Sequence, residues 1–147
     1  MRSLVVVPTY QEAANVERFL RAVRRSAPDV DVMVVDDNSP DGTGRRAEEL
    51  GAELGQISVL HRAAKEGLGA AYREAFAVAL DGLYDVIVQM DCDLSHDPAM
   101  INTLIEAVVE DILAPGLVIE AMDSIPAGVP LEDAVTWLVS ILQARIQ

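Results

Sequence analysis

The sequence has one cysteine, one lysine and no long apolar segment, and each scarcity excludes a class of protein. Cys92 alone can form neither an intrachain disulfide nor a cysteine-based zinc cluster. No apolar run approaches the ~20 residues that a membrane-spanning helix requires. The residues before the first apolar run are too few for a signal peptide, so we expect a cytoplasmic protein.

Basic residues are scarce in the second half of the chain. The 147 residues carry a formal net charge of −13. Residues 1–73 hold 11 acidic and 10 basic side chains, whereas residues 74–147 hold 13 acidic side chains and a single base, Arg145. This charge argues against nucleic acid as a partner. A polyanionic ligand would therefore depend on a metal ion, on backbone N–H groups or on cations of the first half, such as Lys65.

Apolar patterns that alternate between strand and helix predict the fold class. Hydrophobic residues make up 51% of the chain, which is enough for a folded core. The patterns predict strands at residues 4–7, 30–35, 57–60 and 86–90 and helices at residues 12–26, 45–54, 68–80 and 98–110. This order predicts an α/β, Rossmann-like fold: a mostly parallel sheet with right-handed crossovers and flanking helices.

The pattern weakens after residue 111, and the only plausible break in the chain lies near residues 111–116. Beyond it the sequence predicts a short strand at residues 117–119, a loop at residues 121–130 and an apolar helix at residues 131–146. We therefore divide the chain into a core at residues 1–115 and a C-terminal segment at residues 116–147 that packs on the same domain.

Asp91 and Asp93 are the most informative residues, because they follow the predicted strand at residues 86–90 directly. In open α/β sheets, ligands bind at the carboxyl ends of the strands. Carboxylates there are hard oxygen ligands for Mg²⁺ or Mn²⁺, which also hold substrate phosphates. The alternative is a polar loop in which Asp97 caps a helix that begins at Pro98, but it does not explain the Asp91/Asp93 pair.

Polar side chains also follow the first two predicted strands. After the first, Tyr10 can stack on a ligand and Glu12 can hydrogen-bond to it. Position alone favours the alternative, an ordinary turn in which Glu12 supports the N-terminus of the next helix. After the second, Asp36 and Asp37 are acidic residues of the kind that bind ribose hydroxyls or a base edge. The residues that follow them, 38–43, have the composition of a turn.

The third predicted strand ends in residues suited to phosphate. Arg62 and Lys65 are the cations best placed for a diphosphate. Gly67 and Gly69 permit a tight loop, and the next helix would direct its first N–H groups at the same place. Four strand ends that each carry polar residues predict one shared ligand site at that edge of the sheet.

Together these segments resemble the family 2 glycosyltransferases of the GT-A fold, and most of all the dolichyl- or polyprenol-phosphate mannose synthases. The shared motifs are Pro-Thr-Tyr-Gln-Glu at residues 8–12, Asp-Asp-Asn-Ser-Pro-Asp-Gly-Thr at residues 36–43, Lys-Glu-Gly-Leu-Gly at residues 65–69 and Asp-Cys-Asp-Leu-Ser-His-Asp-Pro at residues 91–98. The resemblance is specific and covers residues 3–110.

The resemblance implies a metal-dependent glycosyltransferase with a nucleotide-sugar-binding core at residues 1–115. Its donor would be a nucleoside diphosphate sugar, with GDP-mannose favoured, its acceptor a polyprenyl or dolichyl phosphate at the cytoplasmic face of a membrane, and its cofactor Mg²⁺ or Mn²⁺. The implied nucleotide-pocket residues are Pro8, Tyr10, Glu12, Val35 and Asp37, beside the loop cation Lys65. The implied diphosphate- and sugar-facing residues are Asp91, Cys92 and Asp93, with Asp91 and Asp93 as catalytic residues and Asp91, Asp93 and Ser95 as metal ligands.

The C-terminal segment departs from the family pattern. Met122 stands where the family has an arginine that faces phosphate or sugar, and the family's later basic segments are absent. One alternative is therefore a non-catalytic remnant that binds a nucleotide sugar, or a subunit whose partner supplies the missing cations. Another is a structural α/β domain whose last helix, with Trp137, docks on a membrane or a second subunit.

Overall fold

The structure, a computed structural model, describes residues 1–113. Its strands are β1 (Ser3–Thr9), β2 (Asp31–Asp36), β3 (Ile57–His61) and β4 (Val86–Gln89). Its helices are α1 (Val16–Ser26), α2 (Thr43–Leu54), α3 (Leu68–Asp81), the short 3-10 helix η1 (Pro98–Met100) and α4 (Ile101–Leu113). The order of strands and helices predicted for residues 1–110 is confirmed. The elements predicted at residues 117–119, 121–130 and 131–146 lie outside the described residues.

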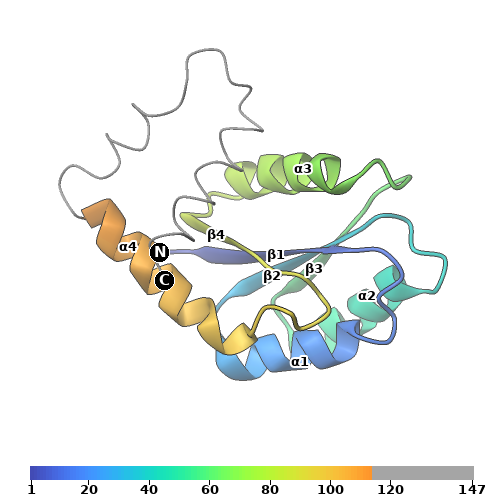
Figure 1. Cartoon of the computed structure of the whole chain (residues 1–147), viewed down its shortest axis with the longest axis horizontal. Coiled ribbons are helices and arrows are strands. Elements are labelled where there is room, and N and C mark those ends of the chain that lie inside the picture. The colour runs from blue at the N-terminus through green and yellow to red at the C-terminus, as the bar shows by residue number, and fades with distance from the viewer. Residues whose placement is uncertain (114–147) are drawn as a thin grey trace, which may run out of the picture. The chain divides into compact units, whose positions relative to one another are not determined.

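All four strands are parallel, in the order β3-β2-β1-β4 (Figure 1). The chain moves outward from β1 through β2 to β3 and then crosses back to place β4 on the other side of β1. The predicted mostly parallel sheet is therefore confirmed. Because the strand order reverses between β1 and β4, the carboxyl ends of these two strands form the point at which an open α/β sheet binds its ligand.

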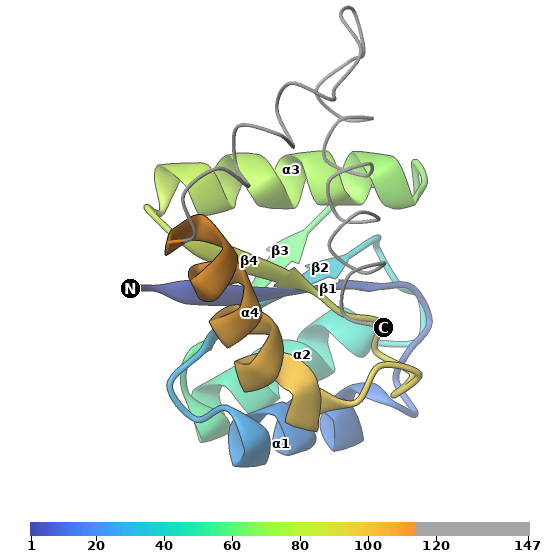
Figure 2. The same cartoon turned by 60° about the vertical axis from the view of Figure 1, so that its left-hand side comes forward.

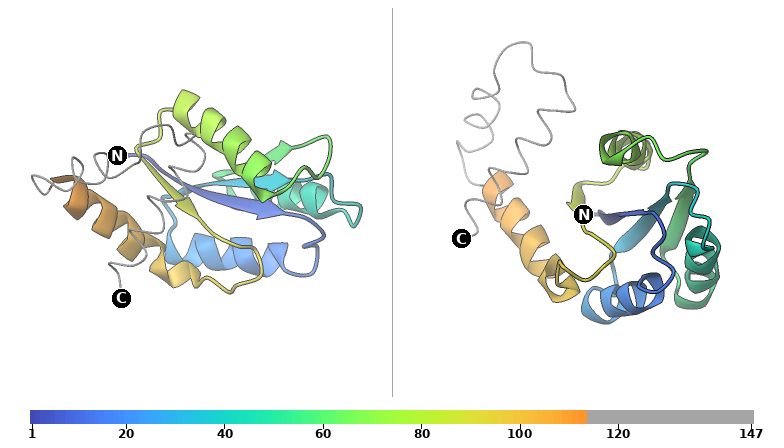
Figure 3. Two further views of the ribbon diagram at one scale, coloured as in Figure 1. Left: turned by 45° about the horizontal axis from the view of Figure 1, so that its top comes forward. Right: turned by 45° about the vertical axis from the view of Figure 1, so that its right-hand side comes forward.

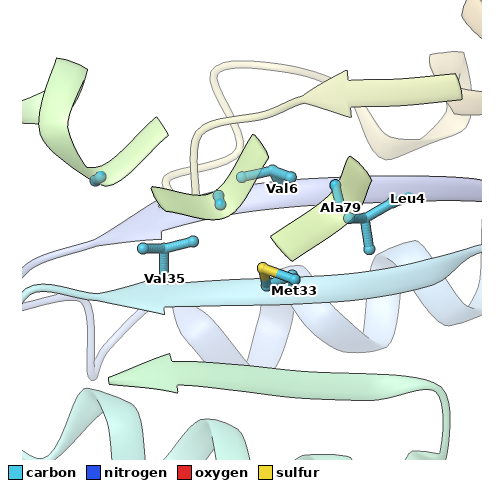
Figure 4. Packing of buried hydrophobic residues seen from close by; sticks show 7 residues of the cluster. Leu4, Val6, Met33, Val35 and Ala79 are labelled. Carbon is cyan, nitrogen blue, oxygen red and sulfur yellow. The ribbon is translucent and has the colours of Figure 1, made fainter. Parts of the chain in front are cut away.

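Helices cover both faces of the sheet: α3 lies on one face, and α1 and α2 lie on the other (Figures 1 and 2). Under α3, strand residues Leu4, Val6, Met33 and Val35 pack against Ala71, Ala75 and Ala79 (Figure 4). The opposite face of β1 is closed by an apolar stripe on α1, which buries Val16, Phe19, Leu20 and Val23. Burial on both sides explains why β1 and β2 read as continuous apolar runs.

The loops that follow β1, β2 and β3 lie together at one edge of the sheet (Figure 3). Contacts group the chain into two units, Met1–Glu106 and Ala107–Gln147, and every candidate site residue described below belongs to the first. The predicted division at residue 115 stays a prediction. Among the helices of residues 1–113, none has the length and apolar character needed to span a membrane.

Candidate functional site

Backbone pairing continues one residue past β2 and β3. The Asp37 N–H donates to the Thr9 carbonyl at 3.0 Å, and the Arg62 N–H donates to the Asp36 carbonyl at 2.9 Å. On the other side of β1, the Met90 N–H donates to the Val6 carbonyl at 3.1 Å. The sheet therefore holds the backbone of Asp37 and Arg62 in place and aligns the start of the segment that carries Asp91.

Asp37 and Arg62 form a buried ion pair. Arg62 Nη1 donates to Asp37 Oδ1 at 2.5 Å. The Arg62 side chain is only 4% exposed and the Asp37 side chain only 9%. Arg62 also donates to Glu74 at 2.9 Å and to Glu66 at 3.0 Å. The hydrogen bonds to Asp37 and Glu74 raise the pKa of the Arg62 guanidinium. Arg62 is thus buried and paired with carboxylates, whereas the sequence predicts a cation that is available to a diphosphate.

Tyr10 and Lys65 meet across the loops that follow β1 and β3. The Lys65 Nζ lies 4.0 Å from the centroid of the Tyr10 ring, and Tyr10 is 37% exposed. Side-chain carbons added at Gly67 or Gly69 would meet no atom within 4 Å, so the backbone beside Lys65 is open to approach. The structure therefore brings together an aromatic face, a cation and an accessible loop at this edge.

The other predicted nucleotide-pocket residues differ in what they expose. Val35 is fully buried in the core under α3, so its side chain contributes packing. Pro8 and Glu12 are half-buried. Glu12 Oε2 accepts a hydrogen bond from Asn15 Nδ2 at 2.8 Å, next to the start of α1. Glu12 thus supports the helix start, as the alternative interpretation of this residue expects.

Asp36 organises the loop between β2 and α2. Asp36 is 3% exposed, and its carboxylate accepts hydrogen bonds from the Thr9 hydroxyl at 2.9 Å, the Ser39 N–H at 3.0 Å and the Ser39 hydroxyl at 2.6 Å. These bonds make Asp36 a loop residue, whereas Asp37 points to Arg62. Adjacent aspartates therefore have separate roles, which the sequence alone left open.

Asp91 and Asp93 lie in the loop that follows β4. Asp93 Oδ1 accepts the Ser95 N–H at 2.9 Å, and hydrogen bonds from the Ser95 side chain and backbone lower the pKa of Asp93. The Asp91 N–H donates to His96 Nδ1 at 3.1 Å. Leu94, between Asp93 and Ser95, adopts a left-handed φ of 66°. This tight loop keeps Asp93 ionised and exposed.

The surroundings of this loop connect it to β1 and α3. Cys92 is 1% exposed, and burial raises the pKa of its thiol to about 12, with further increases from the carboxylates of Glu12, Asp93 and Asp91. Burial likewise raises the pKa of Tyr72, on α3, to about 12, with a smaller effect of Asp91. The Cys92 thiol is therefore neutral and buried, and Asp91 acts on a neighbouring aromatic residue of α3.

The donor set of this loop fits a divalent cation that also binds phosphate. Asp91 and Asp93 supply carboxylate oxygens, and Ser95 lies two residues further on. Within residues 1–113 no group of three or more histidine, cysteine or acidic side chains gathers as a metal cage. Mg²⁺ and related hard cations commonly bind through one or two carboxylates and complete their shell with water and substrate phosphates.

The sequence did not reveal the roles of Asp36 and His96. The signal for Asp36 was available, because an aspartate a few residues before a serine is typical of a side chain that closes a turn on backbone N–H groups. No comparable signal exists for His96, whose contact with the Asp91 N–H depends on the folded loop.

Comparison with known proteins matches residues 4–123 to a family described as Glycosyl transferase family 2. An undecaprenyl-phosphate mannosyltransferase of Micrococcus luteus is 47% identical over 108 residues, which cover 74% of this chain and 44% of the relative. A polyprenol monophosphomannose synthase of Mycolicibacterium smegmatis is 45% identical over 108 residues, which cover 73% of this chain and 41% of the relative. The chain thus spans less than half the length of these curated relatives.

A solved structure of another glycosyltransferase has a similar fold. The mannosyltransferase PcManGT from Pyrobaculum calidifontis, in complex with GDP-Man and Mn²⁺, superposes with a TM-score of 0.54 at 30% sequence identity. The match covers 63% of this chain and 27% of that protein. The described sheet and its helices are therefore similar to the sheet and helices of a protein that binds a nucleotide sugar.

Proposed function

This chain belongs to glycosyl transferase family 2 and has a GT-A type of fold, and from that premise we propose that it binds a nucleoside diphosphate sugar, with GDP-mannose favoured. The observation that carries the proposal is the Asp91/Asp93 pair, which begins two residues after the end of β4, beside β1, where the strand order reverses. The GDP-Man and Mn²⁺ named for the Pyrobaculum structure support this donor and a divalent cofactor.

The described contacts support a different role for each loop in binding the nucleoside, the diphosphate and the sugar. In the proposal, Pro8, Tyr10 and Glu12 bound the nucleoside pocket from the β1 side, while Val35 supports it from the core. Asp37 binds ribose or base, and its pairing with Arg62 holds its carboxylate in one place. Lys65 leaves the Tyr10 ring to face the diphosphate. Asp91 and Asp93 line the phosphate and sugar end, with the buried Cys92 between them in the chain.

Mg²⁺ or Mn²⁺ would be held by Asp91, Asp93 and Ser95. When bound, the metal would neutralise charge on the nucleoside diphosphate leaving group. The acceptor in this proposal is a polyprenyl phosphate at a membrane surface. A phosphate monoester is already largely ionised near neutral pH, so transfer would require no strong general base among the residues of the site.

A second candidate function is donor binding without efficient transfer. One observation favours it: residues 74–144 contain no lysine or arginine, so this stretch offers no cation for an incoming phosphate. In that case the chain would be a nucleotide-sugar-binding unit, or would work with a partner that supplies the cations. Donor binding is common to both candidates, whereas transfer distinguishes them.

Calorimetric titration tests the proposal. GDP, UDP and GDP-mannose are titrated into the chain in the presence of Mn²⁺ and again in EDTA. We expect saturable binding of GDP and GDP-mannose with Mn²⁺ and much weaker binding in EDTA, because acidic side chains and a diphosphate repel each other without a cation. Absence of binding of any nucleotide in Mn²⁺ would refute the proposed function.

A further inference from the structure

Side chains of the β2–α2 loop and of the first residue of α2 bind three consecutive N–H groups of the β1–α1 loop. Gln11 N donates to Ser39 Oγ at 3.0 Å, Glu12 N donates to Thr43 Oγ1 at 2.9 Å, and Ala13 N donates to Asp41 Oδ2 at 3.1 Å. We call Ser39, Asp41 and Thr43 the loop clamp. These N–H groups precede α1, so no helical carbonyl is available to them.

The loop clamp is itself held in place. The Thr43 N–H and hydroxyl both donate to Asp41 Oδ1, at 3.0 and 2.5 Å, which leaves the Thr43 oxygen free to accept from Glu12. Ser39 donates its hydroxyl to Asp36 at 2.6 Å. Desolvation opposes ionisation of Asp41, but hydrogen bonds from Thr43 and Ala13 outweigh it and lower the pKa of Asp41. Each clamp side chain therefore presents one oxygen to the β1–α1 loop as an acceptor.

The β1–α1 loop needs this support, because Gln11 has a left-handed φ of 57°. A residue with a side chain rarely adopts that conformation unless its surroundings impose it. Gln11 directly follows Tyr10, so the conformation at Gln11 determines where the Tyr10 ring leaves the backbone. The contact of Ser39 with the Gln11 N–H thus controls the aromatic face that Lys65 covers.

We propose that Ser39, Asp41 and Thr43 are positioning residues that hold the β1–α1 loop, and with it Tyr10, in the conformation that receives the nucleoside. The inference rests on the proposed function, because it assumes that Tyr10 faces a nucleoside. The clamp acts through backbone N–H groups and has no need to touch the ligand. Its loss should therefore weaken the nucleoside end of the site and spare the metal–phosphate end at Asp91 and Asp93.

Thr43 provides the sharpest test, because it is fully buried and its hydroxyl makes two of the contacts. Thr43→Val keeps the shape and removes the hydroxyl, and Thr43→Ser restores it. Thr103→Val makes the same chemical change at an exposed position of α4 and is the control. Each variant is titrated with GDP and with pyrophosphate, both in Mn²⁺, and amide hydrogen exchange is followed at residues 11–13.

We expect Thr43→Val to bind GDP about tenfold more weakly, the effect of one lost hydrogen bond in a buried network. Its affinity for pyrophosphate should not change, its Glu12 amide should exchange faster, and Thr43→Ser should recover GDP binding. If Thr43→Val binds GDP as tightly as the unmodified chain does, the inference is overturned but the proposed function is not. An equal loss of GDP and pyrophosphate affinity would also overturn the inference, since the clamp would then serve only the fold.

Two further outcomes are decisive. If the unmodified chain binds neither GDP nor pyrophosphate, the proposed function fails and the inference fails with it, which differs from the failure of the inference alone. If Thr43→Val does not fold, Ser39→Ala replaces it, because Ser39 is only half-buried and contacts the strained Gln11 directly. Unchanged GDP affinity in Ser39→Ala, together with unchanged exchange at Gln11, would then overturn the inference.

Discussion

Asp37 is a nearly buried carboxylate whose charge is balanced by one guanidinium. Removing one partner of such a pair is costly, because the other charge is left without compensation in a poorly solvated place. Arg62 in turn contacts three carboxylates, those of Asp37, Glu74 and Glu66. The network joins the β2 end to α3, so a residue proposed to bind the nucleoside is held rigidly before any ligand arrives.

Asp37→Asn should weaken nucleoside binding without unfolding the chain. The asparagine oxygen can still accept from Arg62, but the charged hydrogen bond to ribose or base is lost, which should cost about 1–3 kcal/mol. Calorimetry with guanosine, GDP and pyrophosphate measures the effect, with Asp29→Asn, at an exposed position, as the control. If pyrophosphate affinity falls as much as GDP affinity, Asp37 does not have this role.

Asp93→Ala should abolish metal-dependent nucleotide binding and leave the fold intact. Asp93 is exposed, and its described bond joins it only to Ser95 in its own loop. The measurement is GDP affinity in Mn²⁺ and in EDTA for both proteins, with thermal unfolding as the check on folding. Asp97→Ala, which removes the carboxylate that caps η1, controls for damage to the same loop. Equal affinity of the unmodified chain in Mn²⁺ and EDTA would contradict the metal assignment.

At the scale of elements, the packing under α3 depends on small side chains. Ala71, Ala75 and Ala79 are each at most 1% exposed and pack against β1 and β2 (Figure 4). Well-packed cores have few voids, so an added side chain must displace its neighbours. The small size of these alanines lets α3 lie close to the sheet, and α3 carries Glu74 toward Arg62.

Ala75→Leu should destabilise the chain by about 1–3 kcal/mol, the usual cost of overpacking a core. Ala77→Leu makes the same change at an exposed position of the same helix and should have little effect. Urea unfolding of both variants measures the difference. Similar stabilities would mean that α3 can shift outward and that its close packing on β1 and β2 is not required.

The elements could be predicted from the sequence, and the loop conformations could not. Buried parallel strands are continuous apolar runs, so β1, β2 and β4 are evident. The sequence predicts a helix from residue 12, but α1 begins at Val16 because the residues before it form the clamped loop. Asp36 and Asp37 are the same residue type at adjacent positions, so the sequence does not distinguish them. In the folded strand their side chains point in opposite directions, Asp36 toward Ser39 and Asp37 toward Arg62.

At the scale of the whole molecule, charge separates donor chemistry from acceptor chemistry. Arg62 and Lys65, the two cations considered for the diphosphate, come from the first half of the chain, and Arg62 is already paired with carboxylates. Lys65 and a divalent metal can serve the donor diphosphate. An acceptor phosphate would need a further cation, and after Arg73 the sequence supplies only Arg145.

We therefore expect this 147-residue chain to bind its donor but to transfer mannose to polyprenyl phosphate slowly by itself. Met122, outside the described residues, stands where the resembled family has an arginine, and a missing charge-stabilising donor typically costs about 2.7–4 kcal/mol of barrier, or ~10²–10³ in rate. Radiolabelled transfer from GDP-mannose to a short polyprenyl phosphate, compared with Met122→Arg and with Met100→Arg as an exposed control, measures this. A gain in Met122→Arg alone would support the argument, because only that variant restores the arginine of the resembled family. Transfer by the unmodified chain as fast as by Met122→Arg would refute it.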